Sequence, residues 1–242
     1  MFNNKRLIYF FKKYIFVLII FILFINVSYP QNYDVTILGV PLIKVQLDRS
    51  PNTIKFISKT NGLMDYLWSV ENYYYTEFDS VSFGIKNYYK SIKQGDYIGE
   101  LNCSYDSINK TLLCNDKTIN NQGSVQNIFT LLALVADKDK SFHDAKWFNI
   151  NHEGLKYRAR FLFINYENIK VNNNSVVCNN FRLDIEKKQI DNIRFYPHDY
   201  FTDHIIDNDA IRQIWVEKNG NKIIKASISI YGLDVIAKIN DY

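Results

Sequence analysis

The sequence is poor in the residues that mark joints between domains. It has 242 residues but only 9 glycines and 4 prolines, and it contains no low-complexity linker and no internal repeat. Flexible connections between domains are usually rich in such residues. We therefore expect a single domain over residues 32–242, preceded by a separate N-terminal segment over residues 1–31.

Familiar catalytic motifs are also missing. The chain has no Gly-x-Ser-x-Gly elbow, no phosphate-cradling loop, no dinucleotide fingerprint and no Cys-x-x-Cys pair. The enzyme classes that these motifs identify are therefore excluded. We assign no catalytic residues and no cofactor, and we favour a non-enzymatic protein.

An excess of positive charge is absent beyond the N-terminal segment. The whole chain has 29 Lys and Arg against 25 Asp and Glu, and four of the basic residues, Lys5, Arg6, Lys12 and Lys13, lie in a segment without acids. The remainder is therefore neutral. A nucleic-acid-binding domain would carry a basic footprint, so we expect no nucleic-acid partner.

The N-terminal segment has the features of an export signal. Its basic residues precede an uncharged apolar run, Tyr14–Ile25, which has the length of a signal-peptide core. A permanent membrane helix usually needs roughly 20 apolar residues. Pro30 makes the following stretch a poor cleavage site, so an uncleaved signal anchor is the alternative. We expect export to the periplasm or cell envelope, with membrane contact only through this segment.

What the chain does contain is period-two alternation of apolar and polar residues. Ile43, Val45 and Leu47 alternate with polar residues, and the same pattern recurs at 157–164 and 181–186. Such alternation is typical of antiparallel strands with one buried face. The sequence therefore predicts a mainly β fold, an open or closed antiparallel β-barrel or a strongly curved sheet.

Two turns are expected near the C-terminus. Residues 211–218 and the stretch after Asn221 flank Asn219-Gly220, which predicts a type I′ hairpin turn. Apolar residues then change from even to odd positions at Tyr231-Gly232. This change predicts a bulge or tight bend there.

Two segments lack the period-two alternation that is typical of strands. Residues 124–137 have apolar residues at helical spacing and Ser124 as a candidate N-cap. This segment is apolar almost all round, which predicts one buried helix. Residues 61–78 predict a short helical turn to about Leu67, followed by a strand that carries Val70 and the tyrosines.

The three cysteines follow the export segment, so disulfides are permitted. If Ile108 and Asn109 centre a hairpin turn, Cys103 lies directly opposite Cys114. A disulfide between them is then plausible, and two buried free thiols are the alternative. Cys178 would be left over as a packing residue.

Polar clusters offer weaker candidates for chemistry. Residues 196–209 contain His198, Asp199, Asp203, His204, Asp207 and Asp209. Their spacing fits no zinc or calcium motif, so we expect a solvated loop and no metal site. A hydrolase that uses this cluster with a divalent metal is the alternative. His152-Glu153-Gly154 predicts a turn between two strands, and a catalytic base at His143 or His152 is the alternative.

Aromatic residues crowd into residues 73–89, where consecutive tyrosines must point to both faces of a strand. One hypothesis is a barrel that holds an apolar or lipid-like ligand, lined by Tyr73, Tyr75, Phe129, Leu132, Phe161, Phe163 and Trp215. A second is a structural or interaction protein that docks an envelope partner through exposed aromatic strands. The simplest alternative is an amphipathic strand whose tyrosine hydroxyls reach solvent.

The order of these elements resembles a known family. The motifs are Tyr33 with Gly39 in an opening hairpin, "KTNGLMDYLWSVENYYYTEFD", "SVQNIFTLLALV", "EGLKYRARF", "VCNNFRLDIEKK", "IRQIWVEKNG" and a closing strand after Gly232. Together they resemble the domain of unknown function 3108 family of exported bacterial proteins. Asn127 and Thr130 stand where that family commonly has Asp and Ser, and Leu42 or Ile43 where it often has Gly. The resemblance implies a barrel-like envelope protein and no established activity.

Overall fold

The computed structural model describes residues 30–120, 123–188 and 199–240. The apolar run Tyr14–Ile25 and His198 lie outside the described residues. Within these ranges, no helix is both long enough and apolar enough to cross a membrane.

One antiparallel sheet of 14 strands contains every strand of the described residues. Its first half comprises β1 (Gln31–Ile37), β2 (Val40–Ser50), β3 (Thr53–Thr60), β4 (Val70–Phe78), β5 (Ile85–Gln94), β6 (Tyr97–Asp106), β7 (Thr111–Cys114) and β8 (Lys117–Asn120). Its second half comprises β9 (Phe148–His152), β10 (Leu155–Val171), β11 (Asn174–Lys187), β12 (Ile211–Glu217), β13 (Ile223–Ile230) and β14 (Leu233–Ile239). The prediction of a mainly antiparallel β fold is confirmed.

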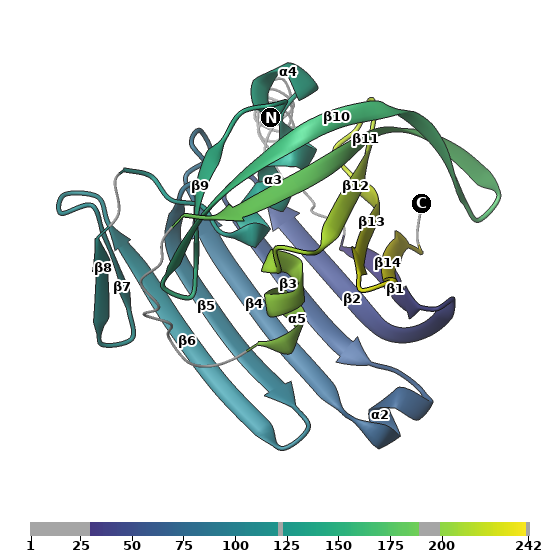
Figure 1. The fold of residues 1–242 in the computed structure, drawn as a ribbon, viewed down its shortest axis with the longest axis horizontal. Helices are drawn as coiled ribbons and strands as arrows, with labels where there is room; N and C mark the ends of the chain where they lie inside the picture. Colours follow the sequence, from purple (N-terminus) through teal and green to yellow (C-terminus); the bar gives the residue numbers. More distant parts are fainter. Residues whose placement is uncertain (1–29, 121–122, 189–198, 241–242) are drawn as a thin grey trace, which may run out of the picture.

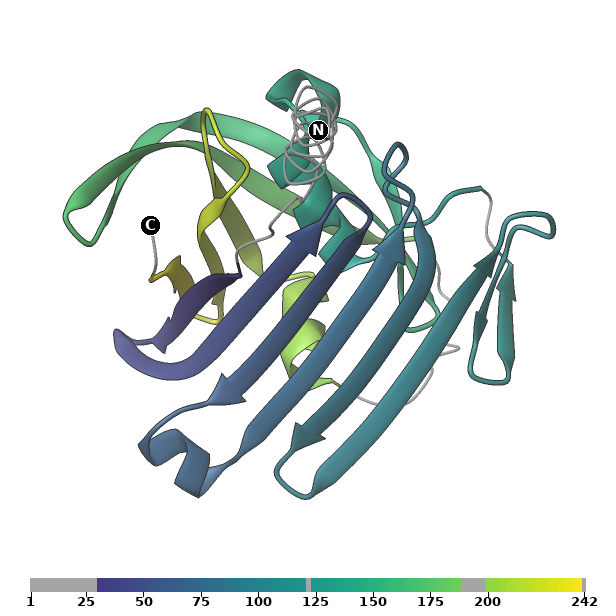
Figure 2. The same cartoon turned by 180° about the vertical axis from the view of Figure 1, so that it is seen from behind.

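The two halves join where β1, the first described strand, pairs with β14, the last. The strand order is β8-β7-β6-β5-β4-β3-β2-β1-β14-β13-β12-β11-β10-β9, so β8 and β9 form the edges of the described sheet and the barrel is not closed. Figures 1 and 2 show β1–β6 as a broad wall and β9–β13 arching over it.

Helices α3 and α5, whose bounds follow, lie between the wall and the arch (Figure 1). The described helices are α2 (Leu63–Leu67), α3 (Ile128–Asp137), α4 (Lys140–His143) and α5 (Tyr200–Ile206). Eight residues of α3 are buried, as expected for a helix that is apolar on nearly all sides. Its Phe129 ring packs against Phe56, Tyr74 and Tyr88 from the wall.

The start of α3 corrects one prediction. The N-cap is Asn127, whose side chain accepts a hydrogen bond from Thr130 N, while Thr130 Oγ1 accepts one from Asn127 N. This reciprocal capping box satisfies two helix-end amides. Ser124 lies three residues earlier on the exposed surface, because Val125 and Gln126 are extended and bond to β5 and β9 instead.

The expected type I′ turn at Asn219-Gly220 is also wrong. Strands β12 and β13 do pair, but five residues connect them, and neither Asn219 nor Gly220 has a positive φ. Glu217 N bonds to Lys222 O instead, and this bond closes a loop longer than a two-residue turn. The bend at Tyr231-Gly232 is a tight turn with φ of 50° and 80°.

Candidate functional site

The site begins at the turn between β9 and β10. His152 pairs with Leu155, so Glu153 and Gly154 form a two-residue turn, with φ of 50° and 94°. Asn151 Oδ1 accepts a hydrogen bond of 3.0 Å from Gly154 N and fixes the turn. Hairpin turns usually lie in solvent, but Glu153 is only 3% exposed. The turn therefore carries a carboxylate into the protein interior.

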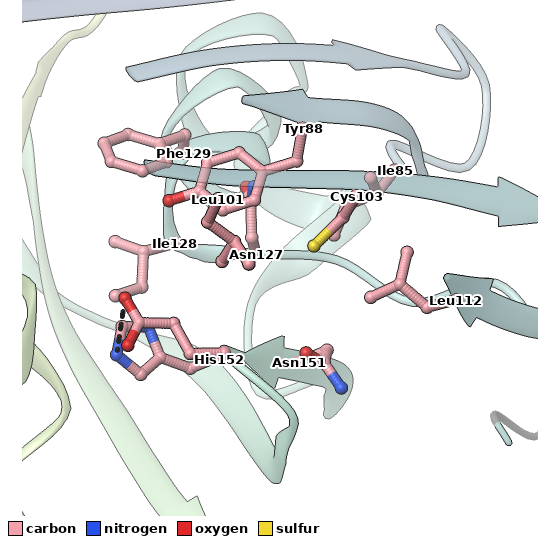
Figure 3. Close-up of a pocket in the computed structure, with 11 residues that line it drawn as sticks. Ile85, Tyr88, Leu101, Cys103, Leu112, Asn127, Ile128, Phe129, Asn151 and His152 are labelled. Atoms are coloured by element: carbon pink, nitrogen blue, oxygen red, sulfur yellow. Dashed lines mark ion pairs between the residues drawn. The ribbon is translucent and has the colours of Figure 1, made fainter. Parts of the chain in front are cut away.

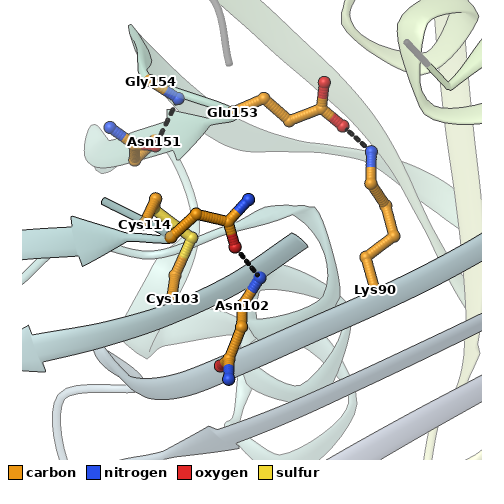
Figure 4. The surroundings of a disulfide bond; sticks show 8 residues. Lys90, Asn102, Cys103, Cys114, Asn151, Glu153 and Gly154 are labelled. Carbon is orange, nitrogen blue, oxygen red and sulfur yellow. Dashed lines mark hydrogen bonds and ion pairs between the residues drawn. A yellow bond between two sulfur atoms is a disulfide. The ribbon is translucent and has the colours of Figure 1, made fainter. Parts of the chain in front are cut away.

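The Glu153 carboxylate contacts Lys90 of β5. Its side chain is completely buried and forms an ion pair with Glu153 Oε1. The Lys90 Nζ also lies 3.8 Å from Asp199 Oδ2, and the Asp199 side chain is equally buried. Figure 4 shows Lys90 and Glu153 extending toward each other from β5 and the turn.

Asp199 links this pair to α5. As the N-cap residue, its carboxylate accepts hydrogen bonds from the amides of Phe201 and Thr202. The same carboxylate accepts a 2.8 Å bond from Tyr74 Oη and a 3.0 Å bond from Gln94 Nε2. Side chains of the wall thus hold α5 against the inner face of the sheet.

We call Lys90, Glu153 and Asp199 the buried ionic cluster. Burial, supported by the carboxylates of this cluster, keeps the neighbouring tyrosines neutral. Burial, then the Asp199 charge, raises the pKa of Tyr74 well above its ordinary value. Burial, followed by the charges of Glu153 and Asp199, does the same for Tyr88. Tyr74 therefore remains a hydrogen-bond donor across the physiological pH range.

The cluster approaches the surface at His152 and Asp203. His152 Nε2 lies 3.4 Å from Asp203 Oδ1 and 3.8 Å from Glu153 Oε1. The Asp203 side chain on α5 is 26% exposed, whereas that of His152 is 7% exposed. These three residues could hold a metal ion, because their ligand atoms all lie within 4.8 Å of one another.

A small pocket adjoins this group and is drawn in Figure 3. It is lined by Ile85, Tyr88, Leu101, Cys103, Leu112, Asn127, Ile128, Phe129, Asn151, His152 and Glu153. The enclosed space is about that of one water molecule. An apolar or lipid-like ligand would not fit there.

The structure separates the seven predicted ligand-lining residues. Phe129 lines the pocket, and Phe161 is fully buried against His143 and Phe181. Leu132 and Phe163 are partly buried against the core. Trp215 is buried, and its indole Nε1 donates to Glu167 Oε2. They therefore form packing contacts at several places and do not surround one cavity within the described chain.

For Tyr73 and Tyr75 the prediction of an inward position is wrong. Burial along β4 alternates so that Tyr74, not its neighbours, is completely enclosed. Tyr74 packs on Phe129 and bonds to Asp199, which fixes the phase of the strand. Tyr73 and Tyr75 therefore point to the outer face, because side chains alternate along a strand.

The segment predicted as a solvated loop is also different. Residues 200–206 form α5, Asp199 is buried, and Asp203 joins His152. These positions could not be predicted from the sequence, because the contacts come from strands more than 40 residues away in the chain. The period-two alternation along β5 does place Lys90 on the inner face of the sheet. This pattern is the signal in the sequence that could have identified Lys90 as a buried residue.

The cysteines occupy two different environments. Cys103 pairs with Cys114 across β6 and β7, and a disulfide joins them (Figure 4). Cys103 also borders the small pocket. Cys178 is a buried free thiol whose pKa burial raises to about 12, so it is a packing residue and a poor nucleophile.

Comparison with known proteins supports the fold but identifies no function. No family model and no curated protein matches the chain. A solved structure, a β-barrel-like protein of domain of unknown function 1849 from Brucella abortus, is similar with a TM-score of 0.53, 9% sequence identity, and coverage of 87% of this chain and 95% of that chain. That family differs from the one the sequence resembles, so membership of the latter stays a prediction. At this identity, what the chain shares with the Brucella protein is a β-barrel-like fold.

Proposed function

We propose that this protein is a non-enzymatic exported protein of the cell envelope that docks a protein partner through the outer face of its sheet. The observation that carries this proposal is a strip of aromatic side chains on that face, Tyr73, Tyr75 and Tyr89. We call these three residues the outer tyrosine strip. Exposed aromatic surface is a common feature of binding sites.

The strip is continuous across two strands. Tyr75 and Tyr89 are direct partners in the β4–β5 register, and the ring centroids of Tyr73 and Tyr89 lie 6.0 Å apart. All three side chains are partly exposed on the outer face. Tyrosine offers large contact area with little conformational entropy to lose, which suits it to the centre of an interface.

Charged residues border the strip. Lys55 Nζ lies 5.7 Å from the Tyr73 ring centroid, and the exposed Lys59 and Glu71 form an ion pair of 2.6 Å. An aromatic centre with a charged rim is the usual composition of a protein–protein interface. The rim adds orientation and selectivity more than affinity.

The packed interior favours docking over ligand carriage. Phe129 occupies the position where a ligand would meet the wall, and α5 is bonded to the same inner face through Asp199. A carrier of apolar molecules needs an enclosed cavity of several hundred Å³. Binding such a ligand here would require α5 to leave.

Site-specific photocrosslinking in cells would test the proposal. A photoreactive residue in place of Tyr75 should give one discrete crosslinked protein. The same residue at Tyr231, which is 80% exposed on the β13–β14 turn, is the control and should give none. The product should weaken when Tyr73→Ser and Tyr89→Ser are added. Absence of a product at position 75, or equal products at both positions, would contradict docking through the strip.

A further inference from the structure

His152, Glu153 and Asp203 bring one nitrogen and two carboxylate ligand atoms within 4.8 Å of one another. They come from two separate elements, the β9–β10 turn and α5, which are 50 residues apart in the sequence. We propose that these three side chains bind one divalent transition-metal ion of the zinc class. This proposal is independent of the docking function.

The distances between the ligand atoms are suitable. Bonds of about 2.0–2.2 Å from zinc to histidine nitrogen and carboxylate oxygen place neighbouring ligands of a tetrahedron roughly 3.3–3.6 Å apart. His152 Nε2 lies 3.4 Å from Asp203 Oδ1 and 3.8 Å from Glu153 Oε1. Two of the three spacings are therefore close to those of a zinc site, and the third is below 4.8 Å. Because Glu153 Oε1 pairs with Lys90, the ion would bind the other oxygen of the Glu153 carboxylate.

The supporting residues also suit a divalent ion. Glu153 and Asp203 offer carboxylate oxygens, and His152 offers an imidazole nitrogen. Lys90 contacts Glu153 and Asp199, and Tyr74 donates a hydrogen bond to Asp199. These contacts would hold the carboxylates around the ion in position.

An independent observation comes from Asn151, which precedes His152. Its side chain is 4% exposed and lines the same small pocket as His152 and Glu153 (Figure 3). Oδ1 is used by Gly154 N, but Nδ2 has no hydrogen-bond partner within the described residues. A buried donor without a partner can be satisfied by a bound solvent molecule that accepts its hydrogen bond. The pocket has room for one solvent molecule, which could fill a fourth position on the ion.

Binding would have a structural consequence. The ion would join α5 to the β9–β10 turn at the exposed end of the buried ionic cluster. Imidazole combined with carboxylates suits zinc and manganese better than magnesium. Access is through Asp203, which is the most exposed of the three residues.

Calorimetric titration of the full chain, purified without a polyhistidine tag and freed of metal with a chelator, would test the site. ZnCl2 should bind with one equivalent per chain, and MgCl2 should bind far more weakly. His152→Gln and Asp203→Asn should each lower the Zn2+ affinity by roughly tenfold or more. His204→Gln is the matched control, since it removes a histidine from the same helix outside the ligand set, and it should bind as the wild type does.

A second readout covers variants that fold poorly. Zn2+ should raise the Tm of the wild type and of His204→Gln, because a ligand that binds only the folded state stabilises it. The Tm of Asp203→Asn should not respond. Absence of saturable binding at one equivalent would overturn the proposal. So would wild-type affinity in His152→Gln and Asp203→Asn, or loss of affinity in His204→Gln.

Discussion

Glu153 occupies a backbone position that usually belongs to another residue type. Two-residue turns with positive φ favour Asn or Gly at the first position, because a β-carbon is disfavoured there. Glu153 nevertheless has a φ of 50°. Its longer side chain is what reaches Lys90 on β5. The ion pair with Lys90 therefore compensates for a turn residue that the local backbone does not favour.

Removing the cation of the buried ionic cluster should destabilise the fold strongly. Lys90→Met would leave Glu153 and Asp199 buried without their common partner, which typically costs about 3–5 kcal/mol in the free energy of unfolding. Lys93→Met is the matched control, because Lys93 lies on the same strand but is exposed. It should change stability by less than about 0.5 kcal/mol. Urea unfolding of both variants measures the difference, and equal stabilities would show that the Lys90 pair is dispensable.

His143 should make stability depend on pH. Its ring lies between Phe161 and Phe181, and burial lowers its pKa to about 4. Protonation therefore favours the unfolded chain, whose histidine has a pKa near 6.5. Stability should be complete above about pH 6.5 and fall by on the order of 2–3 kcal/mol as the pH drops toward 4.

The variant His143→Leu isolates this effect. It removes the titrating group but keeps an apolar side chain of similar size between the two rings. The difference in unfolding free energy between wild type and variant should change between pH 7 and pH 4 in the direction that favours the variant. A difference that is constant over this range would contradict a neutral, buried His143.

At the scale of elements, the sequence predicts where strands form better than it predicts which of their faces is buried or how they are connected. Alternation at 43–47 and 181–186 predicts β2 and β11, because each strand has one buried face. The phase of β4 could not be predicted, since tyrosine suits either face and only the contacts of Tyr74 with Phe129 and Asp199 decide it. Likewise α5 is too short for a periodic signal. The candidate site therefore escapes sequence reasoning because long-range contacts assemble it.

The capping box of α3 offers a direct test of an element boundary. Asn127→Ala should destabilise the protein by about 1–2 kcal/mol, because the helix-end amide of Thr130 loses its acceptor. The change also removes a bond of 3.1 Å from Asn127 Nδ2 to Thr76 Oγ1. Ser124→Ala should have an effect below about 0.5 kcal/mol, since Ser124 is exposed. Thermal unfolding compares the two, and a larger loss for Ser124→Ala would place the helix start at Ser124.

For the whole molecule, the meeting of the chain ends matters most. β14 connects β1 to β13, and this seam is the junction between the wall and the arch. Tyr33 Oη crosses it with a 2.7 Å bond to Ile223 O, and Asn240 N bonds to Asn32 O at 2.8 Å. Burial raises the pKa of Tyr33, so its hydroxyl remains a donor. The curved sheet around α3 and α5 therefore depends on strands from opposite ends of the sequence.

Hydrogen exchange should be slow in the first and last strands of the described sheet. End segments normally exchange first, because few contacts hold them. Here the amides of β1 and β14 should be among the slowest, since each strand has neighbours on both sides and opening the seam breaks the sheet. The amides of β8, a strand of four residues with one neighbour, should exchange fastest among the strands. If β1 and β14 exchanged as fast as β8, wall and arch would unfold separately and the sheet would not act as one cooperative unit.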